Sequence, residues 1–280
     1  MKIGVRVHDF GKSDAKTLAK KAKEVGFDGV QLVLNKAIEG ESGLPGTLSK
    51  EKANEFYNAF KSEGLDIFML GAYFNPVHSD KNKVSQLTEK FREHLKYMND
   101  FHAGFVGSET GSFNDDKWTY NPLNRTEEAF QEVKRIFKDL ANSAEEYNGK
   151  IALEGAFGHC MWEPKRLKRL VDEINSDTVY YTVDIYNYLS NENYMNHTQI
   201  FDECLELFKD RIVIFHIKDF VVEDGSIKQC CIGKGIMNFD YMLPIIKAKC
   251  PNAYLVFEGS KPEDMEYSYN FIKGKLKEIN

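Results

Sequence analysis

The sequence predicts a single-domain (β/α)8 barrel, an α/β fold that spans residues 1–280. Three observations support this prediction. Eight short apolar runs alternate with longer stretches that have the period of helices. No Ser-, Gly- or Pro-rich linker divides the chain. The 280 residues accommodate eight β/α units, and a barrel of this type takes roughly 250 residues.

The predicted strands are short and strongly apolar. Their near-continuous content of Val, Ile, Leu and aromatic residues is typical of parallel strands that are buried on both faces. In chain order they cover residues 2–7, 29–34, 65–70, 103–108, 150–155, 178–185, 211–217 and 253–259.

The stretches between these strands carry the signals of helices. Residues 14–27 have one apolar face with lysines opposite, and Gly26 is a C-terminal stop. Residues 49–65 have Ser49 as the N-cap and Gly64 as the stop. Both stretches therefore predict amphipathic helices that cover the sheet.

The longest predicted helix covers residues 126–149, opens with Thr126 and acidic residues, and ends at Gly149. Its apolar face carries Phe130, Val133, Phe137, Leu140 and Ala144. Residues 238–250 and 263–279 supply the last two predicted helices. This alternation of strands and helices predicts a parallel sheet with the helices outside it.

An open, doubly wound sheet is the alternative architecture. Such a sheet usually carries a Gly-rich phosphate-binding turn after its first strand. The residues after the first predicted strand contain no GxGxxG motif, which favours the barrel.

Composition and charge argue against several function classes. The 37 basic and 43 acidic residues give a net charge of −6, which offers no footprint for nucleic acid or an anionic membrane. The apolar runs are far shorter than the ~20 residues of a membrane-spanning helix, and the N-terminus lacks the features of a signal peptide. The five cysteines contain no CxxC pair, which argues against a disulfide framework or a zinc–thiolate site. We therefore expect a cytoplasmic protein without nucleic-acid or membrane partners.

Polar side chains stand at the ends of the last four predicted strands. Glu154, Asp184, His216 and Glu258 are spaced by 30, 32 and 42 residues, close to one β/α unit each. In a parallel barrel the C-terminal ends of all strands open at one mouth. Because side chains alternate along a strand, all four residues can face that mouth without placing a charge in the packed layers below. We therefore expect them to converge.

Converging carboxylates repel one another unless a cation holds them. Three carboxylates and one imidazole, without sulfur, suit a hard or borderline divalent ion. We expect one divalent metal ion, with Mn²⁺ favoured and Mg²⁺, Co²⁺ or Zn²⁺ as alternatives. A single acidic residue at a strand end is more often a solvated edge or a helix cap, and a single His after an apolar run is usually a core histidine. It is the occurrence of all four residues on successive strands that favours a metal site.

These strand ends resemble those of the xylose isomerase-like TIM barrel superfamily, in particular its sugar phosphate isomerase/epimerase branch. The similarity spans nearly the whole chain. Its most specific part is HIKD at residues 216–219, followed by IGKG at residues 232–235, which resembles the G-x-G loop of that family. The resemblance implies a TIM barrel that acts on a small-molecule carbohydrate, since the branch includes ketose 3-epimerases, inosose dehydratases and hydroxypyruvate isomerases.

By this resemblance, one metal ion is held by Glu154, Asp184, His216 and Glu258, and Glu154 and Glu258 are also the catalytic acid/base pair. The implied reaction is isomerisation or epimerisation of a sugar or sugar phosphate. A carboxylate would remove a proton next to the carbonyl, and the cation would stabilise the resulting enediolate. The alternative is a lyase or dehydratase that acts on a keto-sugar or inosose and starts with the same proton abstraction.

The sequence departs from the family at one position. Many members carry a His three residues after the strand-six Asp, where it touches the substrate. Here that residue is Asn187, which can hydrogen-bond a hydroxyl but does not titrate near neutral pH. We expect Asn187 to bind substrate, but the substrate of a particular epimerase cannot be transferred to this chain.

Other polar residues near the predicted mouth are weaker candidates for substrate binding. In chain order they are His8, His78, Glu109 and Lys218. Lys218 suits either a phosphate or carboxylate of the substrate or a salt bridge to a neighbouring acid. For Trp118 and Trp162, in predicted loops, stacking on a sugar and simple loop packing both stay open.

Two other function classes fit less well. A DNA-repair endonuclease shares the barrel of this superfamily but would need additional His ligands and a basic face, whereas this chain has seven dispersed His residues and a net charge of −6. A non-catalytic sugar-binding subunit would be expected to lack at least one of the four ligands. The sequence leaves open whether the substrate is phosphorylated and whether the chain forms a homo-oligomer.

Overall fold

The computed structural model describes residues 1–279. Within this range eight parallel strands form a closed barrel in the order β1-β10-β7-β6-β5-β4-β3-β2, and pairing of β1 with β2 closes it. The bounds are β1 Ile3–Arg6, β2 Gly29–Leu32, β3 Asp66–Gly71, β4 Phe105–Glu109, β5 Ile151–Glu154, β6 Val179–Asp184, β7 Ile212–Ile217 and β10 Tyr254–Phe257. The eight predicted strands and the barrel architecture are confirmed, and the open doubly wound sheet is excluded.

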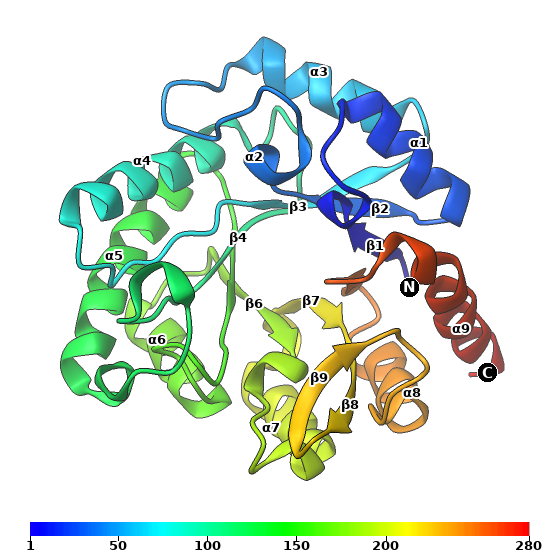
Figure 1. Cartoon of the computed structure of the whole chain (residues 1–280). Coiled ribbons are helices and arrows are strands. Elements are labelled where there is room, and N and C mark those ends of the chain that lie inside the picture. The colour runs from blue at the N-terminus through cyan, green and yellow to red at the C-terminus, as the bar shows by residue number, and fades with distance from the viewer. Residues whose placement is uncertain (280) are drawn as a thin grey trace.

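Helices surround the barrel on its outer side (Figure 1). They are α1 Ala15–Val25, α2 Leu34–Ala37, α3 Lys50–Lys61, α4 Lys81–Tyr97, α5 Glu127–Glu146, α6 Pro164–Ile174, α7 His197–Phe208, α8 Phe239–Lys249 and α9 Met265–Glu278. The predicted helices correspond to α1, α3, α5, α8 and α9. Of the helices in residues 1–279, none combines the length and the apolar composition that a membrane crossing requires.

Short 3₁₀ segments link several of these elements. They are η1 Val7–Phe10, η2 Asp115–Lys117, η3 Pro122–Arg125, η4 Tyr186–Tyr188, η5 Tyr194–Asn196, η6 Lys209–Arg211 and η7 Pro262–Asp264. Segment η1 directly follows β1, and η4 begins two residues after the end of β6. Both therefore shape the mouth of the barrel.

The helix boundaries follow from local capping. The side chains of Asp14, Ser49 and Thr126 each accept a hydrogen bond from the backbone N–H three residues further on. Such N-caps typically stabilise a helix by about 1 kcal/mol. Gly26 ends α1 with a φ of 110°, a left-handed conformation that favours glycine. The predicted start and stop signals of these helices are therefore present in the structure.

Apolar side chains fill the interior of the barrel. The buried members of this inner cluster are Phe68, Met69, Phe105, Ala152, Ile214 and Val256. The ring of Phe68 stacks on Tyr254 with centroids 3.9 Å apart. A Cβ atom at Gly4 or Gly29 would overlap the Phe68 ring, so glycine on β1 and β2 makes room for it. The barrel is thus a packed core rather than a pore.

The inner cluster also fixes the direction of the strand-end side chains. Ala152, Ile214 and Val256 lie in the barrel interior, two residues before Glu154, His216 and Glu258 respectively. Because side chains alternate along a strand, the polar residues point inward one layer higher, at the mouth.

A β-hairpin outside the barrel sheet was not predicted from the sequence. It comprises β8 Asp219–Glu223 and β9 Ser226–Cys230, which pair antiparallel between β7 and α8 in the chain (Figure 1). Its two-residue turn consists of Asp224 and Gly225, both at positive φ, as a type I′ turn requires. Gln229 of β9 donates a 2.6 Å hydrogen bond to the backbone oxygen of Glu258, which anchors the hairpin at the mouth.

Candidate metal centre

Four strand ends bring polar side chains to one point at the mouth of the barrel. Glu154 and Asp184 are the last residues of β5 and β6. His216 is the penultimate residue of β7, and Glu258 directly follows β10. One ligand atom from each residue lies within 4.8 Å of the others. The structure therefore contains the convergence that the strand spacing predicts.

The imidazole of His216 lies among the three carboxylates. Its Nδ1 is 2.8 Å from Glu258 Oε2, 3.2 Å from Glu154 Oε2 and 3.9 Å from Asp184 Oδ2. Burial alone would lower the pKa of His216, but the charges of Glu154 and Glu258 outweigh burial and raise it to about 10. A proton on Nδ1 and a divalent cation are therefore alternative counter-ions for the same carboxylates.

Gln31, in β2, determines which nitrogen of His216 faces the carboxylates. The Nε2 of His216 is 2.7 Å from Gln31 Oε1, while the amide nitrogen of Gln31 donates to the hydroxyl of Tyr73. With the amide oriented in this way, His216 donates through Nε2–H, and its Nδ1 is left for the cluster. Second partners of this kind are common for metal-ligating histidines, because they fix the ring orientation and tautomer.

The donor set fits a divalent cation. Within residues 1–279, His216 Nδ1, Asp184 Oδ2 and Glu258 Oε2 are buried atoms that lie in ion-pair contacts but form no hydrogen bond of good geometry. Unpartnered buried polar atoms are costly unless an ion or another ligand satisfies them. Three carboxylates and one imidazole nitrogen form the oxygen-rich set that suits Mn²⁺, Mg²⁺, Co²⁺ or Zn²⁺.

The side chain of Lys218 points at the cluster formed by Glu154, Asp184, His216 and Glu258. Its Nζ is 2.9 Å from Asp184 Oδ2, 3.1 Å from Glu258 Oε1 and 3.0 Å from Asn187 Oδ1. Burial alone would lower the pKa of Lys218, but the charges of Asp184 and Glu258 outweigh burial and raise it. The ammonium group is thus an internal counter-ion, as in the salt-bridge alternative, and its expected contact with substrate stays a prediction.

Asn187 also bonds within the cluster. Its side-chain nitrogen donates a 2.6 Å hydrogen bond to Glu154 Oε1, and its backbone N–H donates to Asp184 Oδ1. Because its side-chain oxygen accepts from Lys218, both ends of the amide are engaged. In this structure Asn187 orients Glu154, and its expected contact with substrate stays a prediction.

Arg6 provides a second fixed positive charge. Its guanidinium is 2.8 Å from Glu258 Oε1 and 2.8 Å from Asp9 Oδ1. Asp9 also accepts from the backbone N–H groups of Gly259 and Ser260, so it ties the loop after β10 to η1. Glu258 therefore faces two cations through one oxygen and the cluster through the other.

A cavity of about 480 Å³ opens directly beside the cluster. It is lined by Arg6, His8, Val33, Lys36, Tyr73, Glu109, Asp116, Trp118, His159 and Glu258. Of the sequence-predicted substrate residues, His8 and Glu109 lie in this wall, and Trp118 contributes an aromatic surface. Burial and the nearby charge of Glu258 raise the pKa of Glu109 to about 7.

The structure does not bring His78 into this cavity wall. His78 is buried at the start of α4, where its Nδ1 accepts from the backbone N–H of Asp80 at 3.0 Å. Trp162 is placed elsewhere too, with the guanidinium of Arg125 stacked 4.3 Å from its ring centroid. Both residues have a local packing role in the structure.

The loop at residues 232–235 is held by Asp219. The carboxylate of Asp219 accepts hydrogen bonds from the backbone N–H groups of Phe220, Gly233, Gly235 and Met237, at 2.8–3.0 Å. A Cβ atom at Gly235 would overlap the same carboxylate. The G-x-G loop thus binds an anion, but that anion belongs to the protein.

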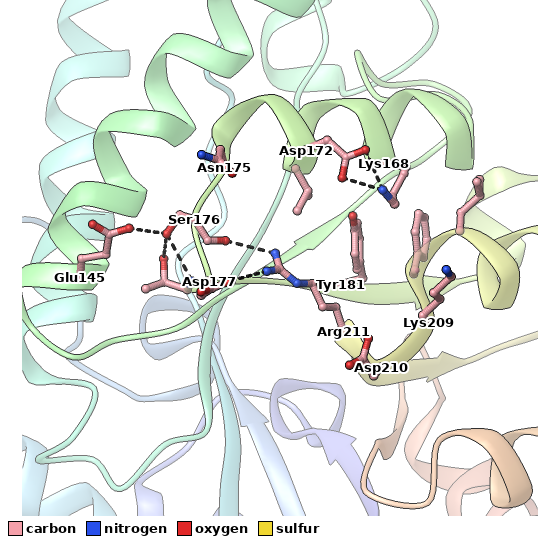
Figure 2. Close-up of a pocket in the computed structure, with 14 residues that line it drawn as sticks. Glu145, Lys168, Asp172, Asn175, Ser176, Asp177, Tyr181, Lys209, Asp210 and Arg211 are labelled. Atoms are coloured by element: carbon pink, nitrogen blue, oxygen red, sulfur yellow. Dashed lines mark hydrogen bonds and ion pairs between the residues drawn. The ribbon is translucent and has the colours of Figure 1, made fainter.

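A larger hollow, of about 800 Å³, lies at the opposite end of the strands (Figure 2). It is built around the residues that precede β6 and β7, and two ion pairs form within its own wall. Lys168 bonds to Asp172, and Arg211 bonds to Asp177 (Figure 2). Active sites of (β/α)8 barrels gather at the C-terminal ends of the strands, so the smaller cavity is the functional candidate.

Four residues near the cluster escaped the sequence analysis. Arg6 and Gln31 are the single polar residues of two apolar strands. Their position near the C-terminal ends of these strands is the signal that could have revealed them. Tyr73 and His159 lie in loops after β3 and β5, where no period relates them to the barrel axis.

Comparisons with known proteins agree with this geometry. Residues 19–275 match the family model described as xylose isomerase-like TIM barrel. None of the curated proteins matches the sequence. Among solved structures, a xylose isomerase-like TIM barrel protein from Mycobacterium smegmatis in complex with magnesium has a TM-score of 0.78 at 14% identity, over 99% of this chain and 97% of that chain.

Two further structures share the fold. A D-tagatose 3-epimerase-like protein has a TM-score of 0.78 at 21% identity, over 100% of this chain and 98% of that chain. The probable 3-DHS dehydratase AsbF from Bacillus anthracis has a TM-score of 0.74 at 13% identity, over 98% of this chain and 99% of that chain. At such identities the structures establish the fold alone, whereas the family model covers most of the sequence. The chain therefore belongs to the xylose isomerase-like TIM barrel family.

Proposed function

We propose that this protein is a divalent metal-dependent isomerase or epimerase that moves a proton next to the carbonyl group of a sugar. The observation that carries the proposal is the convergence of four metal-type ligands beside a cavity of about 480 Å³. Two structural neighbours, one a D-tagatose 3-epimerase-like protein and one a magnesium complex, are consistent with this chemistry.

Glu154, Asp184, His216 and Glu258 would hold the metal ion, with Mn²⁺ favoured. When bound, a divalent ion supplies a Lewis acid that stabilises the negative charge developing on the substrate oxygen as the proton leaves. The remaining work falls to the side chains of the chain itself.

Glu154 and Glu258 are the proposed proton carriers, and their surroundings differ. The second oxygen of Glu154 accepts from the neutral amide of Asn187. The second oxygen of Glu258 faces the cations of Arg6 and Lys218. Cationic neighbours make a carboxylate a weaker base, so we assign Glu154 as the stronger base of the pair.

Solvent-deuterium exchange tests this proposal. The Mn²⁺-loaded protein is incubated in D₂O with a panel of ketoses, and exchange at the carbon next to the carbonyl is followed by NMR. We expect one metal ion per chain and exchange that EDTA abolishes. Glu154→Gln and Glu258→Gln should each lower the exchange rate by about 10²–10⁴-fold, because each removes one proton carrier.

Glu146→Gln serves as the matched control, since Glu146 is an exposed carboxylate at the end of α5. It should exchange at the wild-type rate. Full exchange in thoroughly metal-stripped protein, or in Glu258→Gln, would contradict the proposal. Release of water with formation of a double bond would instead identify a dehydratase, the activity named for the structural neighbour AsbF.

A further inference from the structure

We propose that the cavity takes an uncharged, polyhydroxylated substrate, and that His159 and Glu109 bind two neighbouring hydroxyl groups of it. This inference deepens the proposed function and rests on it for the location of the substrate. It assigns a role to His159, a residue outside the metal cluster, and it decides between free and phosphorylated sugars.

The tautomer of His159 is fixed by the protein. Its Nε2 lies 3.1 Å from the backbone oxygen of Trp118. A carbonyl oxygen only accepts hydrogen bonds, so Nε2 carries the proton. Burial lowers the pKa of His159 to about 4, which keeps the ring neutral. Nδ1 is therefore a lone-pair acceptor.

This acceptor has no partner of its own. His159 is 5% exposed, and among residues 1–279 none forms a hydrogen bond with its Nδ1. Glu109 Oε1 lies 3.7 Å away and is itself an acceptor when ionised. Both residues line the cavity. A buried acceptor without a donor is satisfied when a ligand supplies one.

Two acceptors 3.7 Å apart match a pair of neighbouring hydroxyl groups, each donating one hydrogen bond. Trp118 lies against the same site, with its ring edge-to-face to His159 at 5.5 Å, and offers an apolar surface for the C–H face of a sugar. Neither feature requires a charged group on the ligand.

The charges of the cavity wall argue against a phosphate. Arg6 is already paired with Asp9 and Glu258. Burial lowers the pKa of His8 to about 3, so it is uncharged. Within the described part of the chain, this leaves Lys36 as the one lining cation without an ion-pair partner.

The wall also carries three acids, Glu109, Asp116 and Glu258, so it offers no surplus of positive charge to a dianion. The backbone N–H groups of Gly233 and Gly235, in the G-x-G loop, are already bonded to the carboxylate of Asp219. Nothing in the cavity wall therefore matches the multiple donors that bind phosphate groups.

A pair of substitutions isolates the role of His159. His159→Gln keeps a donor near the Trp118 oxygen but lacks the Nδ1 acceptor, whereas His159→Asn places an amide oxygen close to the Nδ1 position. The probes are the four D-ketohexoses and D-fructose 6-phosphate, added to Mn²⁺-loaded protein. Binding is followed by the fluorescence of Trp118 in a Trp162→Phe background, which leaves Trp118 as the single tryptophan.

We expect at least one free ketohexose to bind, and D-fructose 6-phosphate to bind no more tightly. His159→Gln should weaken binding of the free sugar about tenfold, the effect of one hydrogen bond, and His159→Asn should restore it to within about threefold. His102→Gln, at an exposed histidine after α4, is the matched control and should leave binding unchanged.

The inference is overturned if none of the free sugars binds, if His159→Gln binds them as the wild type does, or if the phosphate ester binds tenfold more tightly and loses that advantage in Lys36→Met. These outcomes are separable from the proposed function. Exchange of a phosphorylated sugar but of none of the free sugars would uphold the function and reject this inference. Binding of free sugars without any proton exchange would do the reverse.

Discussion

The neutral side chain of Gln31 determines which ring nitrogen of His216 is available to bind the metal ion. It accepts from Nε2 and thereby leaves Nδ1 for the cluster. Replacing Gln31 with Leu removes this acceptor, so the His216 ring is free to rotate and its Nε2–H is left without a hydrogen-bond partner in an apolar site. We expect Mn²⁺ affinity to fall about 10–100-fold, measured by calorimetric titration.

Tyr73→Phe is the graded comparison for this prediction. It removes only the hydroxyl that receives the Gln31 amide, so the His216 contact survives. Its loss of affinity should be smaller than that of Gln31→Leu. Unchanged Mn²⁺ binding in Gln31→Leu would show that the ring is held by the barrel packing alone.

Lys90 of α4 makes the stability of the protein depend on pH. It is 4% exposed, and burial together with the nearby charge of Lys36 lowers its pKa to about 8. The folded state therefore holds this proton less tightly than the unfolded chain. The free energy of unfolding should rise as the pH passes from about 8 towards 10.5, where the penalty disappears.

Lys90→Met should consequently be more stable than the wild type at pH 7, by roughly 3 kcal/mol at most. The difference should shrink towards pH 10. Urea unfolding of both proteins at several pH values measures this difference in the free energy of unfolding. The contributions of other titrating groups are the same in both proteins and cancel in the difference. A difference that is constant with pH would mean that Lys90 is not the group responsible.

At the scale of the elements, periodicity explains what the sequence could predict. Two-residue alternation in β5 to β10 was enough to place Glu154, His216 and Glu258 at one mouth. The same alternation could not predict His159 and Tyr73. Both lie in loops, and tertiary packing, not a repeating pattern in the sequence, brings them to the site. Gln31 was overlooked because one polar residue does not disturb an apolar strand pattern.

The hairpin of β8 and β9 could have been predicted, because Asp224–Gly225 is a strong signal for a two-residue turn. The sequence of the neighbouring loop at residues 232–235 shows its resemblance to the family's G-x-G loop, but the anion that the loop binds, Asp219, comes from β8. The pairing of loop and carboxylate is visible only in three dimensions.

Gly235 tests how tightly this loop is built. A Cβ atom there would overlap the Asp219 carboxylate and the Phe220 backbone oxygen, so Gly235→Ala must displace the loop or break its hydrogen bonds. We expect it to lower the free energy of unfolding by about 1–3 kcal/mol, measured in urea. Gly274→Ala, inside α9 with open space around it, should instead raise it by about 0.5–1 kcal/mol. Equal effects of the two substitutions would contradict the role of the loop.

For the molecule as a whole, the barrel and the metal centre are supported by different interactions. The inner cluster around Phe68 and the outer layer of helices bury the apolar core without help from the mouth. At the mouth, the carboxylates already have His216, Lys218 and Arg6 as counter-charges. We therefore expect metal removal to leave the fold intact and to change only its stability.

EDTA treatment should leave the far-ultraviolet circular dichroism unchanged but lower the Tm. A ligand that binds only the folded state, present at 100 times its Kd, adds about 2.7 kcal/mol, and for a chain of this size that corresponds to a shift of about 5 °C. Mn²⁺ should restore the Tm in the wild type. It should not do so in Asp184→Asn, because this substitution removes one ligand charge from a site where Asp184 is fully buried. A Tm that rises equally with Mn²⁺ in both proteins would place the stabilising ion elsewhere on the molecule.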